Sequence, residues 1–313
     1  MRVALIGPGT VSVVHLAAIE KLSASIGLEL AGVCDSRRDH REFLDDVRPE
    51  VVHICTPHDQ HVRIATDALE RGVHVLLEKP VANTVAEADR LVAAAKDHPD
   101  VKIGVCLQNR YNMTSRAAYD LLLSGELGTV TGASASVLWH RDEAYYAAKP
   151  WRGLRSRAGG GVLINQAIHT LDLLQWLLGD VTTVTGHAGC YGGASNEVED
   201  TAHLLLDHAR PARSVFFATT TNAVDSPVTI EIVAERGTLY LRGDLTVAYA
   251  DGRAETVSEL LPGGEGRSYW GASHELLIAD FYRSLDDPEP FWIGPAEALK
   301  AQHLIDEIYR HTS

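Results

Sequence analysis

Residues 1–106 alternate short apolar runs with amphipathic segments, and this alternation limits the possible folds more than any other feature of the chain. Each apolar run has the length of a strand, and each segment between two runs can hold a helix, which is typical of β–α–β units on a parallel sheet. The predicted strands are residues 2–6, 28–34, 51–55, 73–77 and 101–106, and the predicted helices between them include 15–22, 61–71 and 86–95. Thr84 and Glu87 form a capping signal at the start of the last helix.

The pattern changes after about residue 123, where strands separated by turn sequences follow one another directly and indicate an antiparallel sheet. One strongly apolar helix, residues 162–178, interrupts this part, and helices near 274–285 and 295–311 end it. We therefore predict two domains, residues 1–122 and 123–313, and the last helix can pack back on the first domain. The predicted strands are 129–139, 201–206, 214–221, 228–234, 238–242 and 245–250, with loops at 189–195 and 262–266.

The charge of the chain excludes some classes of partner. Its 28 Lys and Arg residues stand against 42 Asp and Glu residues, which gives a net charge of −14. Nucleic acids and anionic membrane surfaces need a basic face, so we expect neither as a partner. No apolar stretch approaches the ~20 residues of a membrane span. Because none of the four cysteines forms a Cys-x-x-Cys pair, a reduced, cytoplasmic protein is expected.

A glycine turn follows the first predicted strand and opens the first helix. Its residues are Gly7-Pro8-Gly9-Thr10-Val11-Ser12. Glycines there let the backbone turn tightly and approach a pyrophosphate, which then sits on the helix N-terminus. Ser12 replaces the third glycine of the usual fingerprint. The position of the turn between a strand and a helix still favours a dinucleotide site.

The end of the second predicted strand bears on the choice of cofactor. Asp35 lies where a carboxylate accepts hydrogen bonds from the adenosine ribose, which favours NAD. Arg37 and Arg38 follow closely, and an arginine beside that ribose can instead take the 2′-phosphate of NADP. We expect NAD and keep NADP as the alternative.

The ends of the third and fourth predicted strands also carry polar groups. Thr56-Pro57 and then His61 follow the third strand, and Glu78-Lys79-Pro80 ends the fourth. In an open α/β sheet, ligands bind outside the carboxyl ends of the strands, so Lys79 is either a solvated cap or a proton-handling group beside a cofactor. His53, His58 and His61 have no paired carboxylate or cysteine nearby in the sequence, so we expect no metal site.

The apolar helix at 162–178 carries a polar stripe. It follows Gly159-Gly160-Gly161, and Asn165, His169 and Asp172 are spaced i, i+4 and i+7, which places them on one face. Unpaired buried polar groups cost ~1–3 kcal/mol each, so these side chains need partners or a cavity. One interpretation is a satisfied core network in which His169 donates to Asp172. We favour the other, a ligand cavity.

These elements together resemble the glucose–fructose oxidoreductase/inositol dehydrogenase (Gfo/Idh/MocA) family. The motifs that carry the resemblance are the glycine fingerprint with His15, Thr56-Pro57 with His61, Glu78-Lys79-Pro80, and the triple glycine followed by Asn165, His169 and Asp172. The resemblance implies an α/β protein with an N-terminal Rossmann domain, a doubly wound parallel sheet. It also implies a C-terminal α+β domain with a large, mostly antiparallel sheet, through whose open face members often form homodimers or homotetramers.

The resemblance also implies an activity. Members transfer a hydride between NAD(P) and a secondary hydroxyl or ketone of a sugar, a sugar derivative or a cyclitol, and Lys79 and His169 would be the catalytic pair. Many members carry Asp where this chain has Asn165, so any step that needs a carboxylate there is in doubt. We expect the cofactor to contact Gly7, Gly9, Thr10, Val11, Asp35, Arg37, Thr56, Pro57, His61, Glu78 and Lys79.

Further side chains are candidates for binding the substrate. Aromatic and arginine residues are dense in segments 139–146 and 151–153, and such groups suit sugar rings and hydroxyls. The predicted substrate contacts are Tyr146, Arg152, Asn165, Asp172 and Tyr111, whereas we expect His274 to be structural. Two rival functions stay open. One is glycoside cleavage or epimerisation with NAD recycled in place, and the other is a non-catalytic dinucleotide-binding sensor.

Overall fold

The computed structural model describes residues 1–192, 196–259 and 272–312. Contacts divide the chain into two units, of which unit 1 comprises Met1–Gln108 with His274–Leu299, and unit 2 comprises Asn109–Ser273 with Lys300–Ser313. This division differs from the expected one after residue 122, because helix α5 (Met113–Ser124) packs on α8 and on strands of unit 2. Helix α10 (Pro295–Thr312) begins in unit 1 and continues in unit 2. The functional roles expected of the two domains stay predictions.

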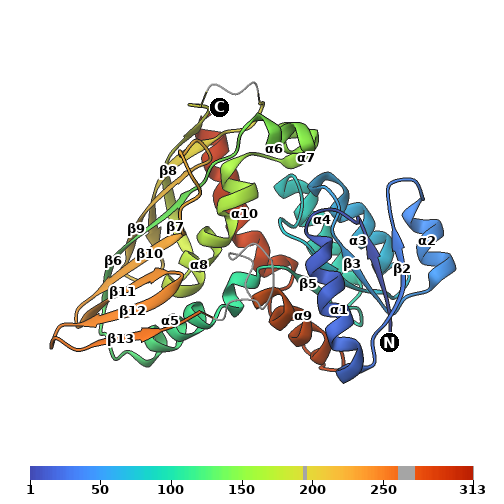
Figure 1. Ribbon diagram of the computed structural model, residues 1–313, viewed down its shortest axis with the longest axis horizontal. Helices are drawn as coiled ribbons and strands as arrows, with labels where there is room; N and C mark the ends of the chain where they lie inside the picture. The colour runs from blue at the N-terminus through green and yellow to red at the C-terminus, as the bar shows by residue number, and fades with distance from the viewer. Residues whose placement is uncertain (193–195, 260–271, 313) are drawn as a thin grey trace. The chain divides into compact units, whose positions relative to one another are not determined.

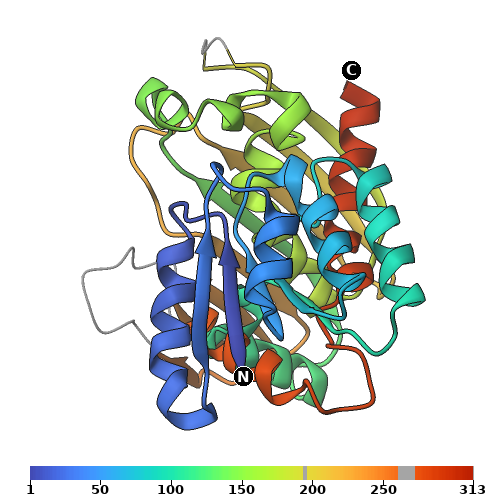
Figure 2. The same ribbon diagram turned by 90° about the vertical axis from the view of Figure 1, so that its right-hand side faces the viewer.

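Unit 1 contains a parallel sheet of five strands in the order β2-β1-β3-β4-β5, as the alternating pattern predicted. Figure 2 shows β1 and β2 side by side and pointing the same way. Because all five strands are parallel, the segments that follow them meet at one edge of the sheet. The strands are β1 (Arg2–Ile6), β2 (Glu29–Cys34), β3 (Val51–Ile54), β4 (His74–Leu77) and β5 (Ile103–Val105).

The helices of unit 1 start where local capping permits. The Oγ1 of Thr84 accepts a hydrogen bond from the Glu87 backbone N–H at 3.2 Å, which confirms the predicted cap. Sequence reasoning missed helix α2, which Asp39 caps through the backbone N–H groups of Arg41 and Glu42. The α-helices are α1 (Ser12–Ile26), α2 (His40–Val47), α3 (His61–Leu69), α4 (Val85–Asp97) and α9 (Ser273–Arg283), and the 3₁₀ turn η1 spans His58–Gln60.

Unit 2 contains a sheet of eight strands in the order β13-β12-β11-β10-β6-β9-β8-β7. Every neighbouring pair is antiparallel except β6 and β9, which confirms the expected large, mostly antiparallel sheet. Sequence reasoning missed β7 and β13. Expected loop residues 193–195 and 262–266 lie outside the described residues. The strands are β6 (Val130–Leu138), β7 (Val181–Gly189), β8 (Thr201–His208), β9 (Arg213–Thr219), β10 (Thr229–Ala234), β11 (Gly237–Arg242), β12 (Asp244–Tyr249) and β13 (Ala254–Val257).

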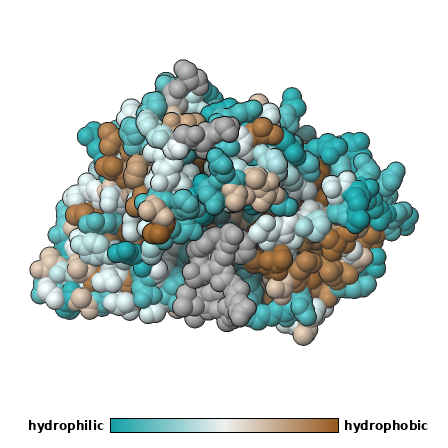
Figure 3. Space-filling view, turned by 45° about the horizontal axis from the view of Figure 1, so that its top comes forward, coloured by the Kyte–Doolittle hydropathy of each residue, from teal (hydrophilic) through white to brown (hydrophobic). Residues whose placement is uncertain are grey.

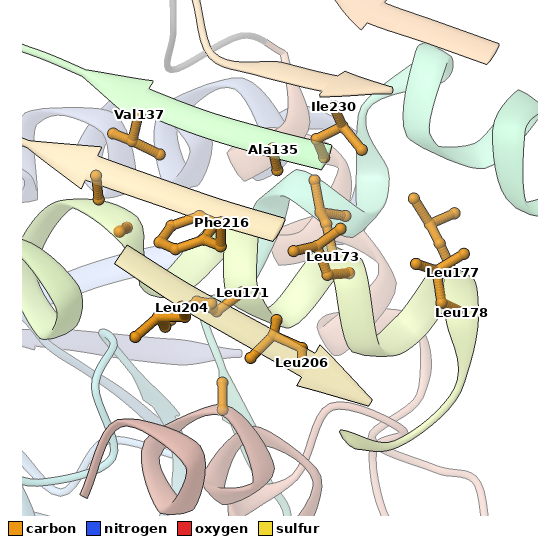
Figure 4. Close-up of a cluster of buried hydrophobic side chains, with 14 of the residues drawn as sticks. Ala135, Val137, Leu171, Leu173, Leu177, Leu178, Leu204, Leu206, Phe216 and Ile230 are labelled. Carbon is orange, nitrogen blue, oxygen red and sulfur yellow. The ribbon is translucent and has the colours of Figure 1, made fainter. Parts of the chain in front are cut away.

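One face of this sheet is covered by helices. Figure 1 shows α5 and α8 on the same side of the strands, and Figure 4 shows leucines of α8 directed at Phe216 of β9 and at neighbouring strands. Alternate residues of β8 and β9 point to the other face, where Leu205, Val215 and Phe217 are exposed. The remaining short helices are η2 (Gln108–Tyr111), α6 (Glu143–Ala148), η3 (Pro150–Gly153) and α7 (Arg155–Ala158).

The predicted helix at 162–178 is two joined helices. Residues Val162–Ala167 form a π-helix, η4, and α8 (Ile168–Leu178) continues it as an α-helix. Single π turns inside helices are frequent at functional sites. Among the described residues, no helix is long and apolar enough to cross a membrane.

Candidate active site

The glycine turn of unit 1 has the geometry that a bound pyrophosphate needs. Gly7 has φ = 92°, and a Cβ there would lie 2.8 Å from the backbone of Cys55 and Thr56, so only glycine fits. Ser12 is buried and donates its hydroxyl to the Gly9 oxygen at 2.7 Å, which closes the turn. No side chain caps the N-terminus of α1 at Val11. The first N–H groups of α1 can therefore bind phosphate oxygens.

The end of β2 brings a carboxylate and a guanidinium together. The Asp35 carboxylate accepts hydrogen bonds from the backbone N–H and the Nε of Arg37, both at 2.9 Å. These hydrogen bonds lower the pKa of Asp35, so the group is an anion near neutral pH. The Arg37 side chain is 88% exposed and held by Asp35, and Arg38 pairs with Asp46. Both arginines that could take a 2′-phosphate are thus engaged by carboxylates.

His61 contacts the loops that follow β3 and β4. Its ring is buried, with Nδ1 2.8 Å from the Pro80 oxygen and Nε2 2.9 Å from the Thr56 oxygen. Burial lowers the pKa of His61. The ring therefore links the loop that holds Thr56 to the loop that holds Pro80. The expected contact of His61 with the cofactor stays a prediction.

Glu78 is likewise a buried group. Its Oε1 lies 3.0 Å from His15 Nε2 and 3.4 Å from His274 Nε2. Burial by itself would raise the pKa of the Glu78 carboxyl, but the hydrogen bond with His15 and the nearby His274 ring outweigh burial and hold it well below its usual value. Glu78 was expected to contact the cofactor, and its oxygens are already occupied within unit 1. His274 contacts Glu78 from α9, in line with the structural role expected of it.

Lys79 follows Glu78 at the carboxyl edge of the parallel sheet. Its side chain is half-buried, and the Lys79–Pro80 peptide bond is cis. The backbone N–H of Lys79 lies 3.2 Å from Glu78 Oε2. Lys79 therefore belongs to unit 1, on the edge where the glycine turn, Asp35 and Thr56 also lie.

Three groups near Glu78 have the residue types of a metal site. His15 Nε2, Glu78 Oε1 and Cys106 Sγ all lie within 4.8 Å of one another. A metal ion binds the thiolate, whereas burial and the charge of Glu78 raise the pKa of Cys106 well above its usual value. Of the three, His15 and Glu78 are joined by a hydrogen bond, and the expected absence of a metal stays a prediction. Sequence reasoning missed this group of three because its members come from distant segments.

In unit 2 the triple glycine is required by packing. A Cβ at Gly160 would lie 2.0 Å from the Tyr309 hydroxyl, and one at Gly161 would lie 1.8 Å from the Glu199 backbone oxygen. The buried Glu199 carboxylate accepts hydrogen bonds from the backbone N–H groups of Gly161 and Leu163 at 2.8 and 3.0 Å. The Tyr309 hydroxyl donates to the same carboxylate at 2.7 Å. The glycines thus bring Glu199 and Tyr309 close to the start of η4.

Two of the three predicted polar residues on this helix are accessible. From Gly161 to Gln175, Asn165 and His169 are the only residues that are not buried. Asn165 lies in the π-helical turn, and His169 is in the first turn of α8. The structure thus gives these two residues a shared, partly exposed position on an otherwise buried helix.

The carboxylate of Asp172 pairs with Arg110. Its oxygens accept hydrogen bonds from Arg110 Nε at 2.8 Å and Nη2 at 2.6 Å, and both side chains are almost completely buried. The sequence pattern did not indicate Arg110 as a partner of Asp172. Asp172 is buried in this ion pair, and its expected contact with substrate stays a prediction. The spacing in the sequence shows which residues lie on the same face of a helix. It does not show which residue of another element pairs with them.

The other predicted substrate residues lie within unit 2. Tyr146 is in α6, and burial raises its pKa. The Arg152 guanidinium lies 4.3 Å from the ring centre of Tyr145, whose hydroxyl accepts a hydrogen bond from Gln166 at 3.1 Å. The segment with Tyr146 and Arg152 is therefore linked to η4. Tyr111 is buried against the Arg116 guanidinium, and its expected contact with substrate stays a prediction.

Comparison with known proteins agrees with the fold and the motifs. The oxidoreductase family with an NAD-binding Rossmann fold matches residues 36–105, and the GFO/IDH/MocA C-terminal domain matches residues 115–240. The levoglucosan dehydrogenase of Pseudarthrobacter phenanthrenivorans is 31% identical over 53% of this chain and 44% of its own length. The D-glucoside 3-dehydrogenase of Escherichia coli is 30% identical over 60% of this chain and 57% of its own. The chain thus spans about half the length of these curated relatives.

A solved structure extends the likeness to nearly the whole chain. The WlbA dehydrogenase of Bordetella pertussis, in complex with NADH and UDP-GlcNAcA, has a TM-score of 0.82 at 26% identity. The match covers 99% of this chain and 95% of that one. The two domain matches together span more than half of the sequence. This chain belongs to the Gfo/Idh/MocA family of oxidoreductases, whose N-terminal domain is an NAD-binding Rossmann fold.

Proposed function

We propose that this protein is an NAD-dependent dehydrogenase or reductase that transfers a hydride between nicotinamide and a secondary hydroxyl or keto carbon. The substrate class is a sugar, a sugar derivative or a cyclitol, in keeping with the relatives that are named as sugar dehydrogenases. The observation that carries the proposal is the accessible pair Asn165 and His169 on a helix that is otherwise buried. Amide and imidazole groups can both donate and accept hydrogen bonds, so this pair is suited to bind the hydroxyl or keto oxygen of a polar ligand.

The residues of the chain would divide the work as follows. NAD, when bound, supplies the hydride acceptor. His169 takes the hydroxyl proton during oxidation and returns it during reduction, since the usual pKa of histidine, about 6.5, suits both directions. Lys79 donates a hydrogen bond to the reacting oxygen and stabilises negative charge on it. Asn165 binds a neighbouring hydroxyl, and it carries no charge with which to assist Lys79.

The chain offers a rationale for NAD over NADP. Asp35 is a charged carboxylate at the end of β2, positioned to accept the ribose hydroxyls and to repel a 2′-phosphate. Arg37, which could have offset this charge, is bonded to Asp35 itself.

We also propose that the protein is a homodimer or homotetramer in a reducing compartment such as the cytoplasm. The exposed sheet face of unit 2 carries Leu205, Val215 and Phe217, with exposed fractions of 58%, 53% and 41%. An apolar sheet face of this kind suits a second copy of the chain. All four cysteines are free, as expected of a reducing compartment.

An absorbance screen at the NADH band tests the activity. A panel of pyranoses and cyclitols is offered with NAD and NADP, and their keto forms with NADH and NADPH. Product formed without net NADH would identify the rival reaction in which the cofactor is recycled. On the substrate found, Lys79→Ala and His169→Ala should each lower kcat by about 10²–10⁴-fold while NADH binding persists.

Matched controls separate this loss from general damage. Lys96→Ala and His303→Ala replace the same residue types at exposed positions on α4 and α10, and both variants should keep full turnover. Near-normal turnover of both the Lys79→Ala and His169→Ala variants would refute the catalytic assignment. Failure of every substrate in the presence of bound NADH would favour a non-catalytic sensor.

A further inference from the structure

Unit 1 contains a continuous line of polar groups inside its core. The Tyr282 hydroxyl of α9 lies 2.8 Å from His53 Nε2, and His53 Nδ1 lies 2.9 Å from His15 Nδ1. His15 Nε2 then lies 3.0 Å from Glu78 Oε1. His15 and His53 are completely buried, and Glu78 and Tyr282 nearly so. Four side chains from four different elements are thus joined end to end, and the line ends at the residue before Lys79.

The geometry allows two arrangements of protons along this line. An ionised Glu78 only accepts, so His15 must carry a proton on Nε2. If His15 is neutral, its Nδ1 accepts from Nδ1–H of His53, and Nε2 of His53 then accepts the Tyr282 proton. If His15 is doubly protonated, the His53 Nε2 donates to Tyr282, whose own proton then needs another acceptor.

The surroundings of Tyr282 favour the first of these two proton arrangements. Among the described residues, the Tyr282 hydroxyl contacts His53 alone, so only the first arrangement uses its proton. A buried hydroxyl proton without an acceptor costs ~1–3 kcal/mol. Burial raises the pKa of Tyr282, so its proton stays in place, and burial lowers the pKa of His53 well below its usual value, so that ring stays neutral.

We propose that Tyr282, His53 and His15 form a one-way hydrogen-bonded line that donates toward Glu78 and keeps it ionised, and that His15 and His274 are positioning residues for Lys79. The connection to Lys79 is local. Glu78 Oε1 accepts a hydrogen bond from His15 and lies 3.4 Å from His274 Nε2, and Glu78 Oε2 accepts from the Lys79 backbone N–H at 3.2 Å. The Glu78 backbone N–H donates to the Ile54 oxygen at 3.0 Å, so the backbone is held just before Lys79 as well.

All titratable groups around Glu78 are consistent with one negative charge at this point. Burial and the charge of Glu78 raise the pKa values of Cys55 and Cys106 well above the usual value, so both thiols are neutral. His15 of α1 and His274 of α9 lie beside the Glu78 carboxylate, and its charge also acts on His53, Cys55, His61 and Cys106. The proposal rests on the proposed function only where it gives Lys79 a catalytic role.

Nitrogen NMR of ¹⁵N-histidine-labelled protein tests the direction of the line without any substrate. At pH about 7, both rings should be neutral, with the proton on Nε2 of His15 and on Nδ1 of His53. Loss of signals in His15→Gln and His53→Gln assigns the resonances. A proton on Nε2 of His53, or a doubly protonated His15, would overturn the proposed direction.

The pH dependence of unfolding tests the charge on Glu78. In the wild type, the low pKa of Glu78 stabilises the fold above about pH 4.3, the usual value for glutamate, and this stability is lost as pH falls. In His15→Leu, burial should dominate and raise the pKa, so the contribution of Glu78 should fall as pH rises. The wild type and His15→Leu are each compared with the same protein carrying Glu78→Gln. The difference in the free energy of unfolding within each pair is the contribution of the Glu78 carboxyl.

His15→Gln is the matched control, because its amide can still donate to Glu78. In His15→Gln, the contribution of Glu78 to the free energy of unfolding should again rise with pH, as in the wild type. If His15 only filled space, the ability of residue 15 to donate a hydrogen bond would make no difference to this sign. An unchanged sign in His15→Leu would contradict the proposal. If His15→Leu does not fold, the NMR measurement on the wild type still decides. Inactivity on every sugar with the expected tautomers would refute the proposed function and leave this inference standing.

Discussion

The ion pair of Arg110 and Asp172 offers a quantitative test of the core of unit 2. Its side chains are only 3% and 2% exposed, and two hydrogen bonds of 2.8 and 2.6 Å join them. Asp172→Asn keeps the shape of the side chain but removes the charge, so the Arg110 guanidinium is left buried without its counter-ion. Breaking a buried pair in this way costs about 3–5 kcal/mol. At ~2–4 °C per kcal/mol for a unit of this size, Tm should fall by roughly 6–20 °C.

The pair and each residue alone should behave differently. Replacing both partners, as Arg110→Met with Asp172→Leu, removes both charges together and should cost less than either single change. Urea unfolding followed by tryptophan fluorescence suits the measurement, because Trp176 lies 5.8 Å from the Arg110 guanidinium. A loss below about 1 kcal/mol in Asp172→Asn would refute the reasoning. So would a double variant as unstable as the sum of the two single ones.

Three more predictions follow from the two units. Gly161→Ala should destabilise the protein by at least ~2 kcal/mol, because its Cβ would overlap the Glu199 backbone oxygen, whereas Gly132→Ala, with 3.6 Å of room, should cost far less in the same urea assay. Asp35→Ala should weaken NADH binding by about 10–150-fold in a fluorescence titration, and it should reduce the difference in affinity between NADH and NADPH. Equal affinity of the wild type for the two cofactors would contradict the NAD assignment. Phe217→Glu should shift the protein to monomers in size-exclusion chromatography with light scattering without loss of stability, and an unchanged oligomer would exclude this face.

Local pattern was enough to predict the two sheets and most of their strands. The parallel strands of unit 1 are buried on both faces and appear as short, continuous apolar runs, so they stand out from the helices between them. In unit 2, β8 and β9 alternate strictly between inner and outer side chains. Helix α2 spans only His40–Val47, and only two of the nine residues of β7 are buried, so neither has a long apolar pattern.

The sequence also identified which helix carries Asn165 and His169, and which strand ends in Lys79. It did not indicate the partners that some candidate site residues have far along the chain. His61, Glu78 and Asp172 each form hydrogen bonds inside their own unit, and their expected ligand contacts stay predictions. The sequence around residue 160 does not indicate that Tyr309 and Glu199 lie against it, although these two residues leave no room for a side chain at Gly160 and Gly161.

By itself, then, the sequence determined the fold class, the family and the positions of the glycine turn, Lys79 and His169, because these depend on local periodicity and on short motifs. Only the tertiary structure decided which polar side chains are buried and with what they pair. Hydrogen bonds and ion pairs need atoms within about 3 Å, a condition that spacing along the chain cannot express. The buried line from Tyr282 to Glu78 joins residues 204 positions apart, and folding alone brings them together.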